Sequence, residues 1–130
     1  MGREWEEFNG GPNEPRNDRK HVTLSKRGII LLNDKIYGEL GRPATAKLLF
    51  DRKMQTIGIR PAGEQEQKVF PLRQKEKASF RFIHAWPFCR HFKIMPPESI
   101  KFTEPEFENG VLVLSLHKTE QIVRNKKRGE

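Results

Sequence analysis

Two histidines and the chain's single cysteine lie close together, at His84, Cys89 and His91. Thiolates and imidazoles ligate zinc and act in nucleophilic catalysis, so this group is the first candidate for chemistry. A structural zinc site needs four ligands and usually a Cys-x-x-Cys or His-x-x-x-His pair, and the chain has neither. Residues two apart on a helix point to different faces, which separates Cys89 from His91. We therefore expect no metal, no cofactor and no catalytic activity, and we interpret Cys89 as a buried hydrophobic residue.

Basic side chains are the second candidate. The net charge is +8, and residues 68–93 carry seven lysines and arginines against a single acidic residue, Glu76. Such an excess attracts polyanions and favours their binding through counterion release. The alternative interpretation is a solvated basic face that keeps the protein soluble, and the sequence alone does not separate the two.

Aromatic residues surround two of these arginines, Arg81 and Arg90. Aromatic rings between cations are typical of platforms on which the bases of single strands stack. The same spacing is more typical of a hydrophobic core, and this is the interpretation we favour. The aromatic residues are Phe80, Phe82, Trp86, Phe88 and Phe92.

Short elements must position these side chains, and the first half of the chain predicts five of them. Asn33 is a good helix cap, while Gly41 and Pro43 are typical of a helix end. The expected elements are a strand at 21–25, a basic turn at 26–28, a strand at 29–32, a helix at 34–40 and a hairpin over 45–60.

The second half of the chain repeats this order. Pro87 is suited to the first turn of a helix, and Asn109-Gly110 between apolar runs is a strong hairpin signal. We expect the two helices, 34–40 and 86–92, to be related by a pseudo-twofold axis, with Leu40 and Phe92 as equivalent buried anchors. A chance likeness between two ordinary α+β segments is the alternative. The expected elements are an edge strand at 69–73, a basic turn at 74–77, a strand at 80–83, a helix at 86–92, and strands at 100–103 and 111–116.

The first half resembles the AbrB/MazE/SpoVT family of swapped-hairpin DNA-binding proteins. In that family two units interlock into one closed β-barrel, and in relatives such as MraZ both units lie in one chain. Pairing two units removes exposed strand edges. The resemblance implies a fold that is mostly β with two short helices, a single-chain pseudo-twofold swapped-hairpin β-barrel built from two strand–helix–hairpin repeats. The matching residues are Gly28–Leu32, Ile36, Leu40-Gly41, Ala46–Phe50 and Thr56–Pro61.

We divide the chain on this basis. The expected segments are a mobile N-terminal tail at 1–20, a first repeat at 21–61, a linker at 62–67, a second repeat at 68–118 and a basic C-terminal tail at 119–130.

The resemblance implies a non-enzymatic, transcriptional-regulator-like protein that binds duplex DNA mainly through phosphates. Arg81 matches an arginine of the family pattern, and Arg90 falls in the basic part of the helix. A pseudo-twofold axis should bring the basic turns of the two halves together in one patch. The expected DNA-binding residues are Lys26, Arg27, Arg73, Lys75, Lys77, Arg81 and Arg90.

Two departures from the family pattern support a second hypothesis. Ile29 stands where the family commonly has arginine, and Tyr37 stands where a basic residue is frequent. The alternative function is therefore a protein-interaction module on the same barrel that has lost DNA binding. A protein partner could bind through Trp5, Phe8 or the basic face, and the chain could form a homo-oligomer.

Localisation follows from what the chain lacks. No apolar run approaches the ~20 residues needed to span a membrane, and the N-terminus is acidic rather than signal-like. A single cysteine fits a reducing compartment. We expect a cytoplasmic protein without membrane contact, associated with the nucleoid if it binds DNA.

Overall fold

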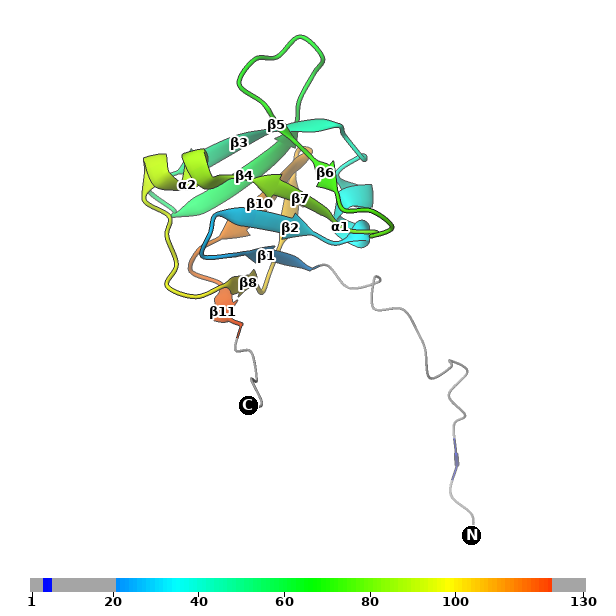
Figure 1. Ribbon diagram of the computed structural model, residues 1–130. Coiled ribbons are helices and arrows are strands. Elements are labelled where there is room, and N and C mark those ends of the chain that lie inside the picture. The colour runs from blue at the N-terminus through cyan, green and yellow to red at the C-terminus, as the bar shows by residue number, and fades with distance from the viewer. Residues whose placement is uncertain (1–3, 6–20, 123–130) are drawn as a thin grey trace.

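The computed structural model describes residues 4–5 and 21–122. Phe8 and most of the two expected tails lie outside these residues, while Trp5 is described and exposed. The expected C-terminal tail begins too early, because Thr119–Gln121 form a strand that pairs with Ile100–Phe102. The fold is mostly β with two short helices, α1 (Asp34–Glu39) and α2 (Trp86–Phe92), as the sequence predicts (Figure 1). In this part of the chain no helix is long and apolar enough to cross a membrane.

The strands form two antiparallel sheets. The six-stranded sheet has the order β11-β8-β1-β2-β7-β6, and the five-stranded sheet has the order β5-β3-β4-β10-β9. The strands of the first sheet are β1 (Val22–Leu24), β2 (Ile29–Leu32), β6 (Arg73–Gln74), β7 (Arg81–His84), β8 (Ile100–Phe102) and β11 (Thr119–Gln121). The strands of the second are β3 (Thr45–Asp51), β4 (Thr56–Pro61), β5 (Phe70–Pro71), β9 (Glu106–Glu108) and β10 (Val111–Ser115).

Strands from the two halves of the chain pair with one another in both sheets. In the six-stranded sheet β2 pairs with β7 and β1 pairs with β8. In the five-stranded sheet β4 pairs with β10 and β3 pairs with β5. Neither half therefore completes a sheet of its own, and both contribute to one core.

The sheets remain open, which corrects the expectation of a closed barrel. Within the described residues the pairing of one sheet ends at β11 and β6, and that of the other ends at β9 and β5. Within the described residues the chain passes between the sheets four times, after β2, β5, β8 and β10, and Pro71 and Pro105 lie at two of these crossings. A proline has no backbone N–H, so neither residue can donate a hydrogen bond between the sheets.

The core lies between the inner faces of the two sheets. Alternate residues of each strand point inward, as the period of two along a strand requires. No polar or charged residue among those described is buried. Inward residues that are completely buried include Val22, Leu24, Ile30, Leu32 and Ile83 of the first sheet, and Ile57, Ile59, Leu112 and Leu114 of the second.

Helix α1 begins and ends as predicted. Asn33 Oδ1 accepts a hydrogen bond from the Ile36 amide at 3.1 Å, which caps the helix. Gly41 follows with φ +97°, the left-handed conformation that glycine adopts most easily. Leu40 is only 5% exposed, so its predicted role as a buried anchor is confirmed.

Helix α2 differs from this expectation at Phe92. Phe88 and Cys89 are the buried residues of the helix, whereas Phe92 is only partly buried. Its ring lies 4.9 Å from that of Phe50, with the Arg52 guanidinium 5.0 Å from its centre. The prediction that Leu40 and Phe92 are equivalent anchors is wrong, because Phe92 belongs to an aromatic group at the edge of the core.

Candidate functional site

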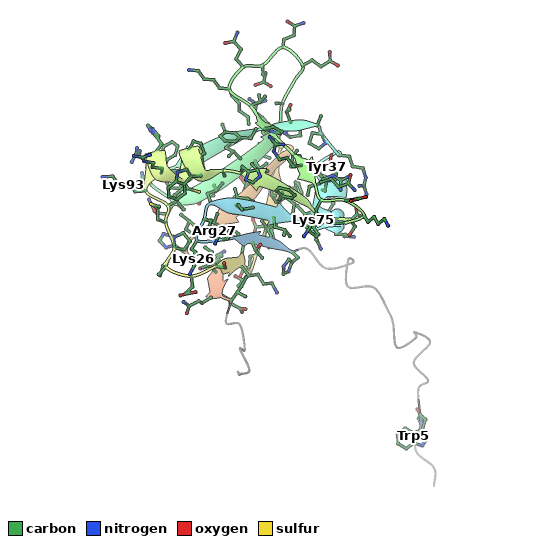
Figure 2. The ribbon with its side chains drawn as sticks, viewed as in Figure 1. Trp5, Lys26, Arg27, Tyr37, Lys75 and Lys93 are labelled. Atoms are coloured by element: carbon green, nitrogen blue, oxygen red, sulfur yellow. The ribbon has the colours of Figure 1, made fainter. Side chains whose placement is uncertain are left out.

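The two basic turns lie at opposite ends of the β2–β7 pair. The antiparallel register places Ile29 opposite His84 and Leu32 opposite Arg81. The turn that precedes β2 therefore lies at the end of β7, and the turn that precedes β7 lies at the end of β2. Figure 2 shows Lys26 at one side of the molecule and Lys75 at the other. The expectation of a single basic patch is wrong, because antiparallel pairing carries equivalent turns apart.

Gly28 holds the first turn against helix α2. Its φ is +81°, and a Cβ at this position would lie 2.9 Å from the Trp86 Cα. The Ala85 amide donates a hydrogen bond to the Gly28 carbonyl at 2.8 Å. Lys26 and Arg27, two residues and one residue before Gly28, are thereby positioned beside the start of α2.

An exposed tryptophan and five cations gather at this end of the molecule, and we call them the Trp86 cluster. Trp86 is 41% exposed and lines a hollow of about 470 Å³ with Pro87, Arg90 and His91. In the part of the chain that the structure describes, no ion pair joins any of the five cations to a carboxylate. The cluster consists of Lys26, Arg27, Arg52, Trp86, Arg90 and Lys93.

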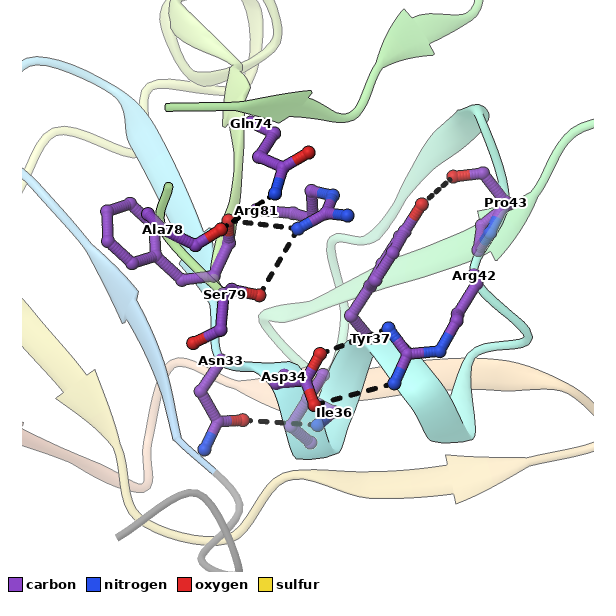
Figure 3. Close-up of polar contacts among 11 residues, drawn as sticks. Asn33, Asp34, Ile36, Tyr37, Arg42, Pro43, Gln74, Ala78, Ser79 and Arg81 are labelled. Atoms are coloured by element: carbon purple, nitrogen blue, oxygen red, sulfur yellow. Dashed lines mark hydrogen bonds and ion pairs between the residues drawn. The ribbon is translucent and has the colours of Figure 1, made fainter. Parts of the chain in front are cut away.

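A second group, the Tyr37 cluster, lies at the opposite end, and it is partly committed to internal contacts. The guanidinium groups of Arg81 and Arg42 lie 4.6 and 5.6 Å from the centre of the Tyr37 ring. The Tyr37 hydroxyl donates a hydrogen bond to the Pro43 carbonyl at 2.7 Å (Figure 3). The cluster consists of Tyr37, Arg42, Lys75, Lys77 and Arg81, and Arg73 lies instead on the outer face of the six-stranded sheet.

Two arginines of the Tyr37 cluster are held by their neighbours. Arg42 donates two hydrogen bonds to Asp34, at 3.0 and 3.4 Å, and these lower the pKa of the Asp34 carboxyl (Figure 3). Arg81 donates to the carbonyls of Ser79 and Phe80 at 3.2 and 3.4 Å. Arg81 is therefore less available to a ligand than the sequence suggests.

The outer face of the six-stranded sheet separates the two clusters. One row of paired residues runs across five strands of this sheet, and its members share one face. In order across the sheet they are Lys101, Thr23, Leu31, Phe82 and Arg73. These residues alternate with the buried inner ones, so their face is the outer one.

A groove of about 820 Å³ lies over part of this outer face. Ile29 and Leu31 form its apolar floor, and Lys26 and Arg27 stand at one end. The other lining residues are Thr23, Ser25, Glu98, Ser99, Gln121 and Ile122.

The structure separates the histidines from the cysteine. His84 and His91 are exposed, whereas Cys89 is buried and burial raises its thiol pKa to about 11. No group of three His, Cys, Asp or Glu side chains in the described part of the chain is arranged to hold a metal ion.

The exposure of Trp86 is the main feature that sequence reasoning missed. Phe88 is buried and Phe80, Phe82 and Phe92 are partly buried, in keeping with a core role. Trp86 lies four residues before Arg90, and this spacing puts both on one polar face of α2. The four-residue spacing of Trp86 and Arg90 was the sequence signal that Trp86 lies on the exposed side of the helix.

No protein-family model matches the chain, and no characterised protein or solved structure shows significant similarity to it.

Proposed function

We propose that the protein is a non-enzymatic, regulator-like DNA-binding protein of the cytoplasm that contacts duplex phosphates through its two basic clusters. The observation that carries this proposal is the Trp86 cluster, whose five cations pair with no carboxylate in the described part of the chain. Surface cations without a carboxylate partner are free to neutralise the phosphates of a polyanion. The polyanion then releases its condensed counterions, which favours binding. Lys75 and Lys77 of the Tyr37 cluster supply a second contact.

The spacing of the clusters supports this arrangement. Strand β2 has four residues, so its ends lie about 10 Å apart at roughly 3.3 Å per residue, and the two clusters lie beyond these ends. The major groove of B-DNA is about 12 Å wide. The two clusters then meet the two phosphate backbones that border one groove, with the outer face of the six-stranded sheet over the groove.

We also propose that the fold is a pseudo-twofold pair of swapped-hairpin repeats, like the tandem MraZ arrangement. Four pairings support this idea: β2 with β7, β4 with β10, and the matched pairs β1 with β8 and β3 with β5. A helix follows both β2 and β7. Twofold-related clusters then account for two phosphate contacts in one chain.

A salt titration with duplex DNA of random sequence tests the function. If the clusters neutralise Z phosphates, log K falls with log salt at a slope of about −0.9Z. Replacing Lys26 and Arg27 with Glu, or Lys75 and Lys77 with Glu, should weaken binding to all sequences alike and reduce the slope by about 2. Lys68→Glu, an exposed change in the loop before β5, is the control and should alter binding least.

A second candidate function is a protein-interaction module, which the apolar floor of the groove at Ile29 and Leu31 favours. An acidic protein segment would then occupy the groove beside Lys26 and Arg27. Absence of duplex binding by the wild-type chain even at low salt would rule out the DNA proposal and favour this one.

A further inference from the structure

The side chain of Trp86 is exposed at the start of helix α2. Trp86 is one of the large hydrophobic residues that stay exposed among those described, with 41% of its surface accessible to solvent. Its backbone is fixed by close contact with Gly28 and by the hydrogen bond from Ala85. The ring is therefore presented on a rigid support, as a binding platform requires.

The surroundings of the ring are suited to an anionic aromatic ligand. The hollow beside Trp86 is lined by Pro87, Arg90 and His91, with no acidic residue. Lys26 and Arg27 approach from the neighbouring turn, which Gly28 packs against Trp86. A tryptophan face with cations around it binds single-stranded nucleic acid by stacking on a base while the cations meet the phosphates.

We propose that Trp86 stacks on an unpaired nucleobase, so that the Trp86 cluster prefers DNA with a single-stranded overhang to blunt duplex DNA. This inference rests on the proposed function and adds a ligand class to one of its two clusters. Arg90 would contact the phosphate next to the stacked base, because it lies one helical turn from Trp86 on the same face.

Tryptophan fluorescence gives a direct test, because the chain has only two tryptophans. A Trp5→Phe chain reports on Trp86 alone. The probes are a blunt duplex and the same duplex with a short thymidine overhang. We expect the overhang to quench Trp86 emission and to bind more tightly than the blunt duplex.

Substitution of Trp86 provides the second measurement. Trp86→Ala should weaken overhang binding about 5- to 150-fold, the loss that corresponds to one stacked base, and Trp86→Phe should weaken it less. The matched control is Leu49→Ala, since Leu49 is 40% exposed on the five-stranded sheet. It should leave binding unchanged.

Three outcomes overturn the inference. Equal binding of both probes without quenching would refute stacking but leave duplex binding intact. Equal effects of Trp86→Ala and Leu49→Ala would do the same. Failure to bind either probe would refute the proposed function as well. If Trp86→Ala does not fold, the quenching of the Trp5→Phe chain and the Trp86→Phe affinity still decide the question.

Discussion

Tyr37 is a neutral residue whose ring contacts two arginine side chains. Its ring lies against the guanidinium groups of Arg42 and Arg81. These are cation–π contacts, in which the negative face of the ring attracts the guanidinium group. Tyr37 carries no charge, so the positive charge around it comes from Arg42 and Arg81, which its ring contacts.

Glu66 should make stability depend on pH in the acid range. It accepts two hydrogen bonds from Arg60 at 2.9 Å and one from the Gly63 amide, which lower its pKa from 4.5 to about 2. A carboxyl with a lowered folded-state pKa adds stability that is complete above pH 4.5 and is lost as pH falls towards 2. Urea unfolding at several pH values should therefore show a flatter acid dependence for Glu66→Gln.

The control for this prediction is Glu64→Gln in the same loop, because no hydrogen bond or ion pair involves the Glu64 side chain in the described structure. An unchanged pH dependence in Glu66→Gln would contradict the assigned role of the Arg60 contact.

Cys89 should resist thiol reagents in the native protein. It is 1% exposed, and burial raises its pKa to about 11. Because the thiolate is the reactive form, both accessibility and ionisation oppose the reaction at pH 8. A disulfide reagent should label Cys89 slowly in buffer and rapidly in guanidinium chloride, and rapid native labelling would show that α2 opens readily.

At the scale of elements, the contact between the first basic turn and α2 is the central arrangement. Gly28 permits it in two ways: it adopts a positive φ, and it leaves room for the Trp86 backbone. The turn and the helix come from different halves of the chain, so this contact unites cations that lie about sixty residues apart in sequence.

Gly28→Ala should destabilise the fold and disturb the Trp86 cluster. The positive φ alone costs about 1–2 kcal/mol for an L-residue, and the new Cβ would meet the Trp86 Cα at 2.9 Å. Gly41→Ala is the matched control, because Gly41 has φ +97° but no atom within 4 Å of the added Cβ. Chemical denaturation should show the larger loss for Gly28→Ala, and equal losses would mean that the turn moves away freely.

The two helices should differ in their response to truncation. Leu40→Ala should cost about 2–5 kcal/mol, the range for a buried leucine. Phe92→Ala should cost less than a buried phenylalanine would, because its ring is partly exposed beside Arg52. Urea denaturation of both variants checks this, and a larger loss at Phe92 would restore its role as a core anchor.

At the scale of the whole molecule, the two halves depend on each other. The β2–β7 and β4–β10 pairs, together with β1–β8 and β3–β5, all join strands of different halves. A single half would leave these edges unpaired and half of the core open to water.

We therefore expect a fragment of residues 21–61 to be unfolded as a monomer. Mixing it with a fragment of residues 62–122 should restore β structure, which circular dichroism would detect. The intact chain is the reference. A folded, monomeric 21–61 fragment would contradict the shared core.

The sequence by itself determined the local features of the fold. The Asn33 cap, the Gly41 helix end and the Asn109-Gly110 turn all occur as predicted, with φ of +51° and +81° at the two turn residues. Such features depend on residues only a few positions apart, whose conformational preferences are intrinsic. The mostly β composition with two short helices follows from the same local patterns.

Only the tertiary structure decided where the charges gather and which aromatic ring is exposed. The separation of the Lys26 and Lys75 turns follows from the register of β2 with β7, and the outward position of Trp86 follows from the packing of α2 against Gly28. The open sheets follow from the strand pairing, which ends at β11 and β6 in one sheet and at β9 and β5 in the other. These features depend on pairings between strands about fifty residues apart, which local periodicity does not specify.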